Sequence, residues 1–213
     1  MFFNRKPQFT DRAWLEEKLK FSDALHGIQS SLQSEIMPLC VYHFKNTGIK
    51  FERYLIDHGL HLKRLNALDE LDSRTGESWR KSTDAILIAS SMISVDHLGS
   101  KRSNIRKKQF SLHLIEHYPI PDPDERILQF CAKRRDILDP IAYVALNEPW
   151  LVKSIGDRVI PLLEKLGLDE NECLEHALIS SSIRRAQQKL KESISVERPH
   201  DSMQAWVDDN LES

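Results

Sequence analysis

The chain of 213 residues contains little glycine. Its seven glycines are about 3% of the residues, against about 7% in an average protein. Folds that cradle a phosphate or turn sharply between strands depend on glycine, because it adopts positive φ without strain and lets the backbone approach a ligand closely. No glycine-rich phosphate loop is found in the sequence. This shortage favours a helical protein.

Cysteine, net charge and long apolar runs are also scarce. Three cysteines cannot form a disulfide framework and are typical of a reducing compartment. The net charge of -2 creates no overall attraction to nucleic acid or to an anionic membrane. The longest uncharged stretch, Ala85 to Val95, has eleven residues, whereas a membrane span needs about 20. We therefore expect a cytoplasmic protein without a membrane span.

In the N-terminal half, apolar residues recur at spacings of three, four and seven, which is typical of amphipathic helices. Three long helices are predicted over residues 10–37, 49–68 and 78–98. A fourth begins in the basic segment 101–108 and ends at Tyr118. The middle of the third helix is apolar on every side, which indicates the centre of a bundle.

Pro119, Pro121 and Pro123 mark the clearest boundary in the chain, because proline disfavours helix in the residue before it. Beyond them the pattern predicts short helices and one long helix: 123–135, 140–147, 149–155, 158–166, the long helix 169–193, and a last short helix that carries Met203, Trp206, Val207 and Leu211. The predicted fold class is all-α. An N-terminal bundle of about four helices, residues 1–118, precedes a C-terminal helical region, residues 119–213, and the two form either separate domains or one continuous domain.

Histidines at helical spacing are candidate metal ligands. His58 and His61 are three residues apart, and His113 and His117 are four apart with Glu116 between them. Both spacings place two imidazoles on one helix face, where a bundle can offer them to a single ion. These five residues predict a divalent-metal site in a helical-bundle enzyme as one alternative. No cofactor is otherwise required by the sequence.

A basic cluster suggests a second alternative. The positive residues of the segment that precedes the last N-terminal helix could contact phosphates: Lys101, Arg102, Arg106, Lys107 and Lys108. In this alternative the protein binds nucleic acid.

The leading functional hypothesis is a protein partner. The last short helix follows the break at Pro199 and offers Trp206 on an apolar face, with Met203, Val207 and Leu211 beside it. Buried tryptophan anchors are common at protein interfaces. Because no complete catalytic constellation is found, no catalytic residue is assigned. The hypothesis is a non-enzymatic interaction or regulatory module of the adaptor type, which binds a protein partner or a second copy of itself.

Overall fold

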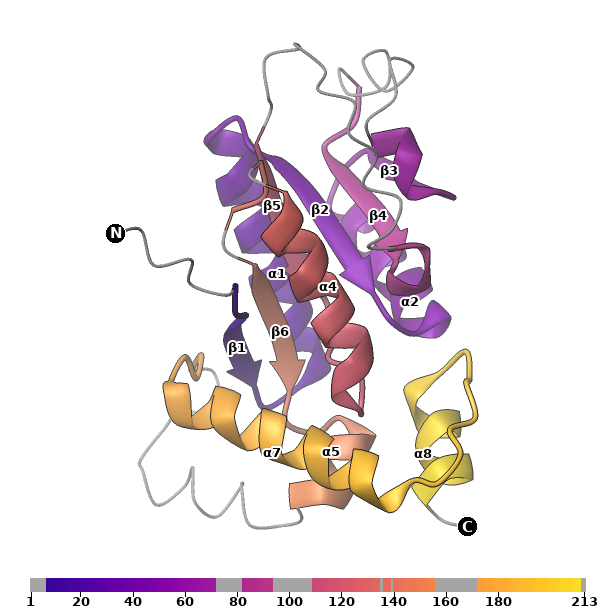
Figure 1. Cartoon of the computed structure of the whole chain (residues 1–213). Helices are drawn as coiled ribbons and strands as arrows, with labels where there is room; N and C mark the ends of the chain where they lie inside the picture. Colours follow the sequence, from indigo (N-terminus) through magenta and orange to yellow (C-terminus); the bar gives the residue numbers. More distant parts are fainter. Residues whose placement is uncertain are drawn as a thin grey trace, which may run out of the picture.

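A parallel β-sheet forms the centre of the computed structural model (Figure 1). The structure describes residues 7–71, 82–93, 109–134, 136–138, 140–155 and 172–211. The sheet has six strands in the order β1-β6-β5-β2-β4-β3, and every pairing is parallel. The strands are β1 (Thr10–Trp14), β2 (Met37–Tyr42), β3 (Leu62–Arg64), β4 (Ala85–Ala89), β5 (Phe110–Leu114) and β6 (Ile141–Ala145). The protein is therefore α/β, and the prediction of an all-α bundle is wrong.

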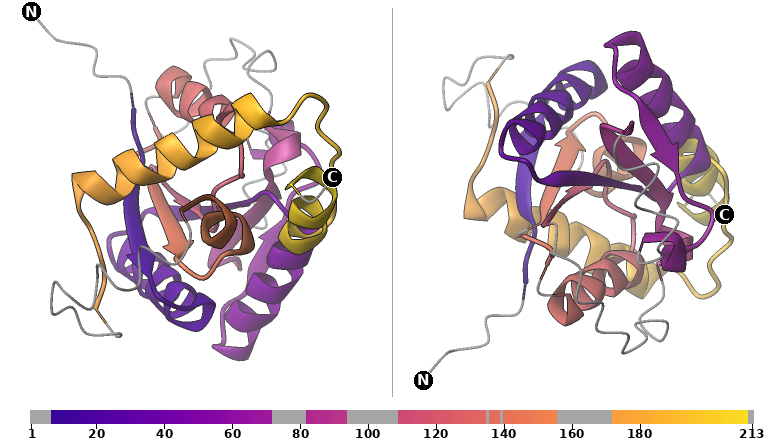
Figure 2. Two further views of the ribbon diagram at one scale, coloured as in Figure 1. Left: turned by 90° about the horizontal axis from the view of Figure 1, so that it is seen from below. Right: turned by 90° about the horizontal axis from the view of Figure 1, so that it is seen from above.

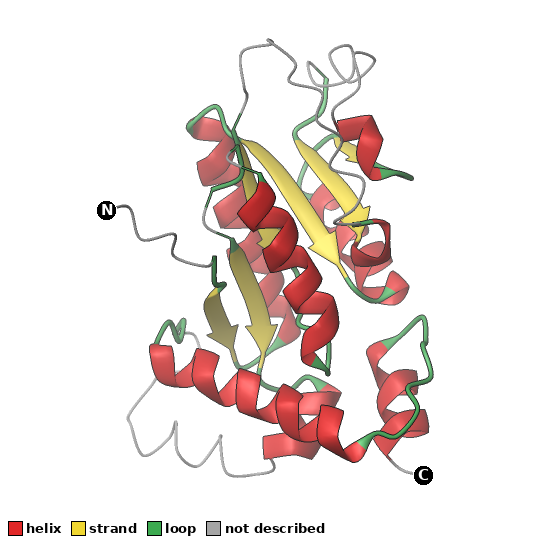
Figure 3. Ribbon diagram, viewed as in Figure 1, coloured by secondary structure: helices red, strands yellow, loops and turns green. Residues whose placement is uncertain are grey.

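Helices cover both faces of the sheet and its carboxyl edge (Figures 1 and 3). One face packs against α1 and α2, the other against α4, and α5, α7 and α8 lie beyond the ends of the strands. The helices are α1 (Glu17–Gln33), α2 (Lys45–Asp57), α4 (Pro121–Lys133), α5 (Pro149–Ile155), α7 (Ala177–Ser193) and α8 (Met203–Leu211), with short 3₁₀ turns η1 (Leu68–Leu71) and η2 (Ser90–Met92). None of the helices in the described part of the chain is long and apolar enough to cross a membrane.

The central strands were mistaken for helix because both of their faces are buried. The segment 85–89 is β4, whose Ile86 and Ile88 point into the core beneath α4. Its Ala85 and Leu87 point toward α1 and α2. A strand buried on both faces has no polar positions, so a short apolar run cannot be told from a buried helix by its period.

The other N-terminal errors have the same cause. The predicted helix 10–37 contains β1, α1 and the first residue of β2. The predicted helix 49–68 contains most of α2 and then β3. The segments 101–118 and 140–147 contain β5 and β6. Residues 101–108 and 158–166 lie outside the described residues.

The predicted helices 123–135 and 149–155 are confirmed as α4 and α5. The predicted long helix 169–193 is confirmed only in its later part, because α7 begins at Ala177 and residues 172–176 are not helical. Proline in the first turn marks the start of α4, as expected of a residue that lacks an amide donor. Gly48, in contrast, lies inside α2 rather than before it. A Cβ at this position would lie 2.6 Å from the Tyr42 ring.

The C-terminal helices form a third layer at the carboxyl edge of the sheet. Seen from below, α7 crosses the molecule and α5 lies beneath the strands, with α8 beside α2 (Figure 2). Trp150 and Trp206, both fully buried, pack there with Phe44 and Val144. The end of the sheet where ligands usually bind in α/β folds is thus covered by the chain itself.

Candidate functional site

Buried charged side chains gather where β2, β5 and β6 end. Glu116, His117 and Glu148 come directly after strands, whereas Lys20 lies in α1, Asp124 in α4 and Asp11 in β1. Each is less than a tenth exposed: Lys20, Glu116, His117, Asp124 and Glu148, with Asp11 from β1. Burial of a charge is costly unless it is paired. The pairing of each group therefore decides what this edge can do.

The Glu116 carboxylate occupies the start of α2. It accepts hydrogen bonds from the backbone amides of His43 (3.1 Å) and Phe44 (2.8 Å) and from the Thr47 hydroxyl (2.6 Å). Burial raises the pKa of Glu116, whereas Lys20, the Thr47 hydroxyl and the Phe44 amide oppose the rise. The N-terminus of a helix favours an anion. Here the anion belongs to the chain.

Lys20 and Glu148 form an almost fully buried ion pair. The Lys20 Nζ lies 2.8 Å from Glu148 Oε1. Glu148 also accepts from the amide of Ala145 and from the indole of Trp150, each at 3.1 Å. Burial acts to lower the pKa of Lys20, but the carboxylates of Glu148 and Glu116 outweigh it and raise the pKa. The pair joins α1 to the end of β6.

His117 lies between two aspartates. Its Nδ1 is 2.6 Å from Asp124 Oδ2 and its Nε2 is 3.0 Å from Asp11 Oδ1, so both nitrogens donate and the ring is an imidazolium. Burial acts to lower the pKa of His117, but the two carboxylates raise it to about 10. In turn, burial acts against charge on Asp11 and Asp124, and the imidazolium nevertheless lowers the pKa of both. His43 extends the cluster, because its Nε2 lies 2.7 Å from Asp124 Oδ1.

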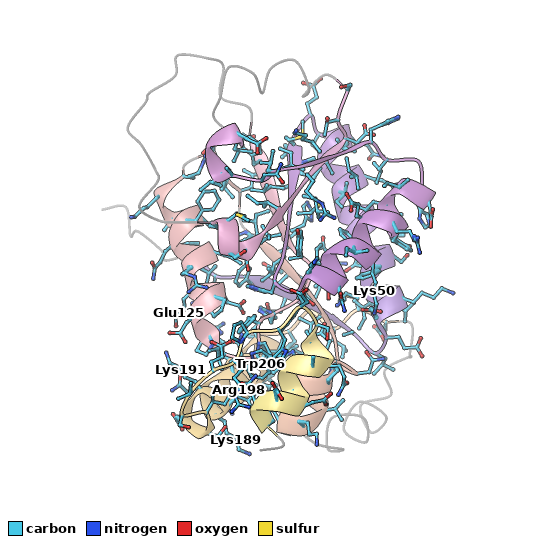
Figure 4. All side chains as sticks on the ribbon, turned by 90° about the vertical axis from the view of Figure 1, so that its right-hand side faces the viewer. Lys50, Glu125, Lys189, Lys191, Arg198 and Trp206 are labelled. Carbon is cyan, nitrogen blue, oxygen red and sulfur yellow. The ribbon has the colours of Figure 1, made fainter. Side chains whose placement is uncertain are left out.

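The C-terminal segment covers these groups. The indole of Trp206 donates to Glu197 (3.0 Å), which also accepts from the Tyr118 hydroxyl. The Phe44 and Tyr118 rings stack with centroids 5.2 Å apart. The backbone carbonyl of Asp201 accepts from the amide of Asn46 in the first turn of α2 (3.0 Å). Figure 4 shows Trp206 among the C-terminal helices.

The two buried thiols are not activated nucleophiles. Cys40 and Cys131 are buried in the core, and burial raises the pKa of both thiols, to about 12 for Cys131. A thiolate is the reactive form. Neither thiol is therefore reactive, whereas the Ser90 hydroxyl lies 2.8 Å from Nδ1 of His43, whose Nε2 lies 2.7 Å from Asp124 Oδ1. This Ser-His-Asp arrangement resembles the hydrogen-bonded set that activates a serine hydroxyl.

The predicted metal ligands lie in different places. His58 is exposed at the end of α2, and its Nδ1 lies 2.7 Å from the Tyr54 carbonyl. His61 is exposed beside Asp84. Only Glu116 and His117 belong to the buried cluster, and in the described residues no three His, Cys, Asp or Glu side chains are grouped to hold an ion. The metal-enzyme alternative therefore has no support.

His113 lies on the opposite face of the sheet from α4. Its ring nitrogens are 3.0 Å from the Tyr143 hydroxyl and 3.0 Å from the Ser111 hydroxyl. Burial lowers the pKa of His113 to about 4, so the ring is neutral. A Cβ on Gly27 of α1 would lie 2.3 Å from the Tyr143 hydroxyl, so any larger residue there would force the Tyr143 side chain to move.

The other predicted binding residues have these outcomes. The basic residues Lys101 to Lys108 lie outside the described residues. Met203, Trp206 and Val207 are buried against the rest of the chain, and Leu211 is partly buried with them. In this arrangement the four side chains form part of the hydrophobic core.

Three residues of the buried cluster are not predicted from the sequence: Lys20, Asp11 and Asp124. Lys20 precedes Phe21 on the buried face of α1, so a lysine in phase with the apolar positions was the available signal. Nothing in the sequence pairs Asp11 with His117, since 106 residues separate them. Their meeting depends on the order of the strands.

Comparisons with known proteins give local similarity to the translocase subunit SecA of several bacteria. No protein-family model matches the chain. A segment of 69 residues is 35% identical to "Protein translocase subunit SecA" of Chlorobaculum tepidum and covers 32% of this chain and 7% of that protein. In Bacteroides thetaiotaomicron SecA, 70 residues are 31% identical, covering 33% of this chain and 6% of the relative. In Desulforapulum autotrophicum SecA, 49 residues are 43% identical, covering 23% and 6%. The similarity thus spans less than a tenth of each SecA chain.

Two solved structures resemble the chain distantly. The Pyrococcus furiosus Hef helicase domain has a TM-score of 0.42 at 16% identity and covers 64% of this chain and 28% of its own. The C-terminal part of the Fun30 ATPase domain has a TM-score of 0.43 at 12% identity, with coverage of 81% and 54%. At these values the likeness carries no conclusion. The hypothesis of a helical adaptor is wrong, because the fold is an α/β sheet and Trp206, the proposed docking anchor, is buried in the core.

Proposed function

We propose that this chain acts in protein translocation, as an α/β domain related to a segment of SecA. The local identity of 35% over 69 residues carries the proposal. The matched segment is a small part of SecA, so the proposal concerns one domain and not the whole translocase. The cytoplasm is the proposed place of action.

The carboxyl edge of the sheet suggests how such a domain would work. In open α/β sheets this edge is the usual ligand site, yet Glu116 here takes two backbone amides and a hydroxyl at the start of α2. The sequence also has no glycine-rich phosphate loop. As part of the proposal, any nucleotide phosphates used in translocation are held by another domain or chain.

Depletion of the protein in its source organism tests the role in translocation. Newly made exported proteins are pulse-labelled, and the rate at which they leave the cytoplasm is measured. We expect export to slow and to recover when the chain is supplied from a plasmid. Unchanged export in the depleted cells, in an assay where loss of SecA slows it, would refute the proposal.

A titration with a fluorescent ATP analogue tests the second part. We expect no saturable binding to the purified chain up to millimolar nucleotide, because the donors at the start of α2 are already occupied. Saturable binding at micromolar concentration would show that the chain holds nucleotide by itself. That result would leave the export experiment unaffected.

A further inference from the structure

A cavity opens beside the His117 cluster. Its volume is about 240 Å³, and it lies between the start of β1, the first turns of α4 and the middle of α7. Asp11, His117 and Asp124 contribute to its wall. Ligand sites are typically concave and mostly apolar, with a few fixed polar groups. The cavity lies apart from the start of α2, where Glu116 replaces an external anion.

An unused hydrogen-bond acceptor lines the cavity. Gln187 of α7 is only 2% exposed. Its Nε2 donates to the Tyr118 carbonyl (2.8 Å) and to Asp124 Oδ2 (2.7 Å), which fixes the orientation of the amide. Its oxygen Oε1 has no donor among the described residues. This oxygen is therefore an acceptor that a ligand with a hydrogen-bond donor can use.

The charges around the cavity favour a cation. Three carboxylates line it, from Asp11, Asp124 and Glu125, against two positive groups, the His117 ring and Arg184. One negative charge is therefore left over. Glu125 and Arg184 are exposed and lie at the rim of the cavity. Their charges therefore act on a bound ligand, and the hydrophobic core does not depend on them.

The remaining walls are apolar. Phe9 meets His117 edge-on, with ring centroids 5.6 Å apart, and Pro121, Leu128 and Ile183 complete the lining. An alkyl chain can pack against these side chains while its charged end reaches the acceptors. Aromatic and acidic groups together suit an organic cation.

We infer that this cavity binds an organic cation on an alkyl stem, of the alkylguanidinium or alkylammonium type. Such a group occurs as the side chain of arginine or lysine in a peptide and as a free small amine. The inference rests on the cavity and its polar groups, so a failure of the proposed role in translocation would not affect it. Figure 4 shows Glu125 near Lys191, on the side where α4 and α7 meet.

Titration with n-butylguanidinium, followed by NMR of the full chain, tests the inference. We expect saturable shifts at Phe9, His117 and Gln187. The control is n-butylurea, which has nearly the same shape but no charge, and we expect it to bind at least about fivefold more weakly. Equal shifts with the two compounds, or none with either, would overturn the inference. A short peptide with one arginine, compared with its citrulline counterpart, shows whether a peptide side chain also enters.

Two rim variants with opposite expected effects sharpen the test. Glu125→Gln removes a negative charge and should weaken n-butylguanidinium binding roughly two- to fivefold, whereas Arg184→Gln should strengthen it by a similar factor. Arg185→Gln is the matched control, because Arg185 is the exposed neighbour of Arg184 and does not line the cavity. If the three variants bind the cation equally well, its site is not this cavity.

Discussion

Lys20 is the clearest case of a single residue on which buried charges depend. Its ammonium pairs with Glu148, and both side chains are almost fully buried. Lys20→Met keeps the length of the side chain but leaves Glu148 and Glu116 without their cation, and it should lower the free energy of unfolding by about 3–5 kcal/mol. Urea denaturation measures the change. Lys50→Met removes an exposed partner of Glu17 and should cost less than about 1 kcal/mol, so similar losses in the two variants would contradict this role.

The pKa values of the two buried histidines, His117 and His113, are shifted in opposite directions, so the two rings should affect stability in different pH ranges. The pKa of His117 is about 10 in the fold against 6.5 ordinarily, so its contribution to stability is complete below pH 6.5 and is lost as the pH rises toward 10. The pKa of His113 is about 4, so its contribution is complete above pH 6.5 and is lost as the pH falls toward 4. NMR titration of the ring carbons separates the two. A His117 ring that loses its proton near 6.5 would show that the aspartate pair does not hold it.

At the scale of elements, α8 stabilises the molecule as part of its core. Trp206 is fully buried against Tyr118, with ring centroids 5.8 Å apart. Trp206→Ala should lower the free energy of unfolding by about 3–5 kcal/mol, because it removes a large apolar side chain and leaves a cavity. Val196→Ala, in the same C-terminal segment but at a side chain 77% exposed, should change it by less than about 0.5 kcal/mol. A small loss in Trp206→Ala under urea would show that α8 detaches before the rest unfolds.

Some of the helices could be predicted from the sequence, whereas the strands could not. Proline marks the starts of α4 and α5, and this signal is local, so it could be read without the fold. The strand β4 is five apolar residues whose identity depends on what covers its two faces. Such burial is a property of the whole sheet, and no local pattern reports it.

The candidate site was harder to foretell than the fold. Glu116 and His117 were noted for their spacing on a supposed helix, whereas they follow β5 and point to different partners. The spacing was therefore accidental. The partners of His117 come from β1 and α4, and only the strand order, with β6 inserted between β1 and β5, brings those elements together.

At the scale of the whole molecule, stability should decline from the centre of the sheet to its edge. β2 pairs with both β4 and β5 and all six of its residues are buried, whereas β3 is an edge strand of three half-buried residues. Parallel strands cannot pair locally, so the central hydrogen bonds should open only when the whole domain unfolds.

Native-state hydrogen exchange tests this gradient. We expect the amides of Val41 and Leu112 to exchange with the free energy of global unfolding, and their exchange to accelerate with urea as steeply as unfolding itself does. The amide of Lys63 in β3 should exchange faster, with little dependence on urea, because a strand edge opens locally. Equal protection in β2 and β3 would mean that the sheet opens as one unit, and the layer formed by α5, α7 and α8 would then have to stabilise its edge as strongly as its centre.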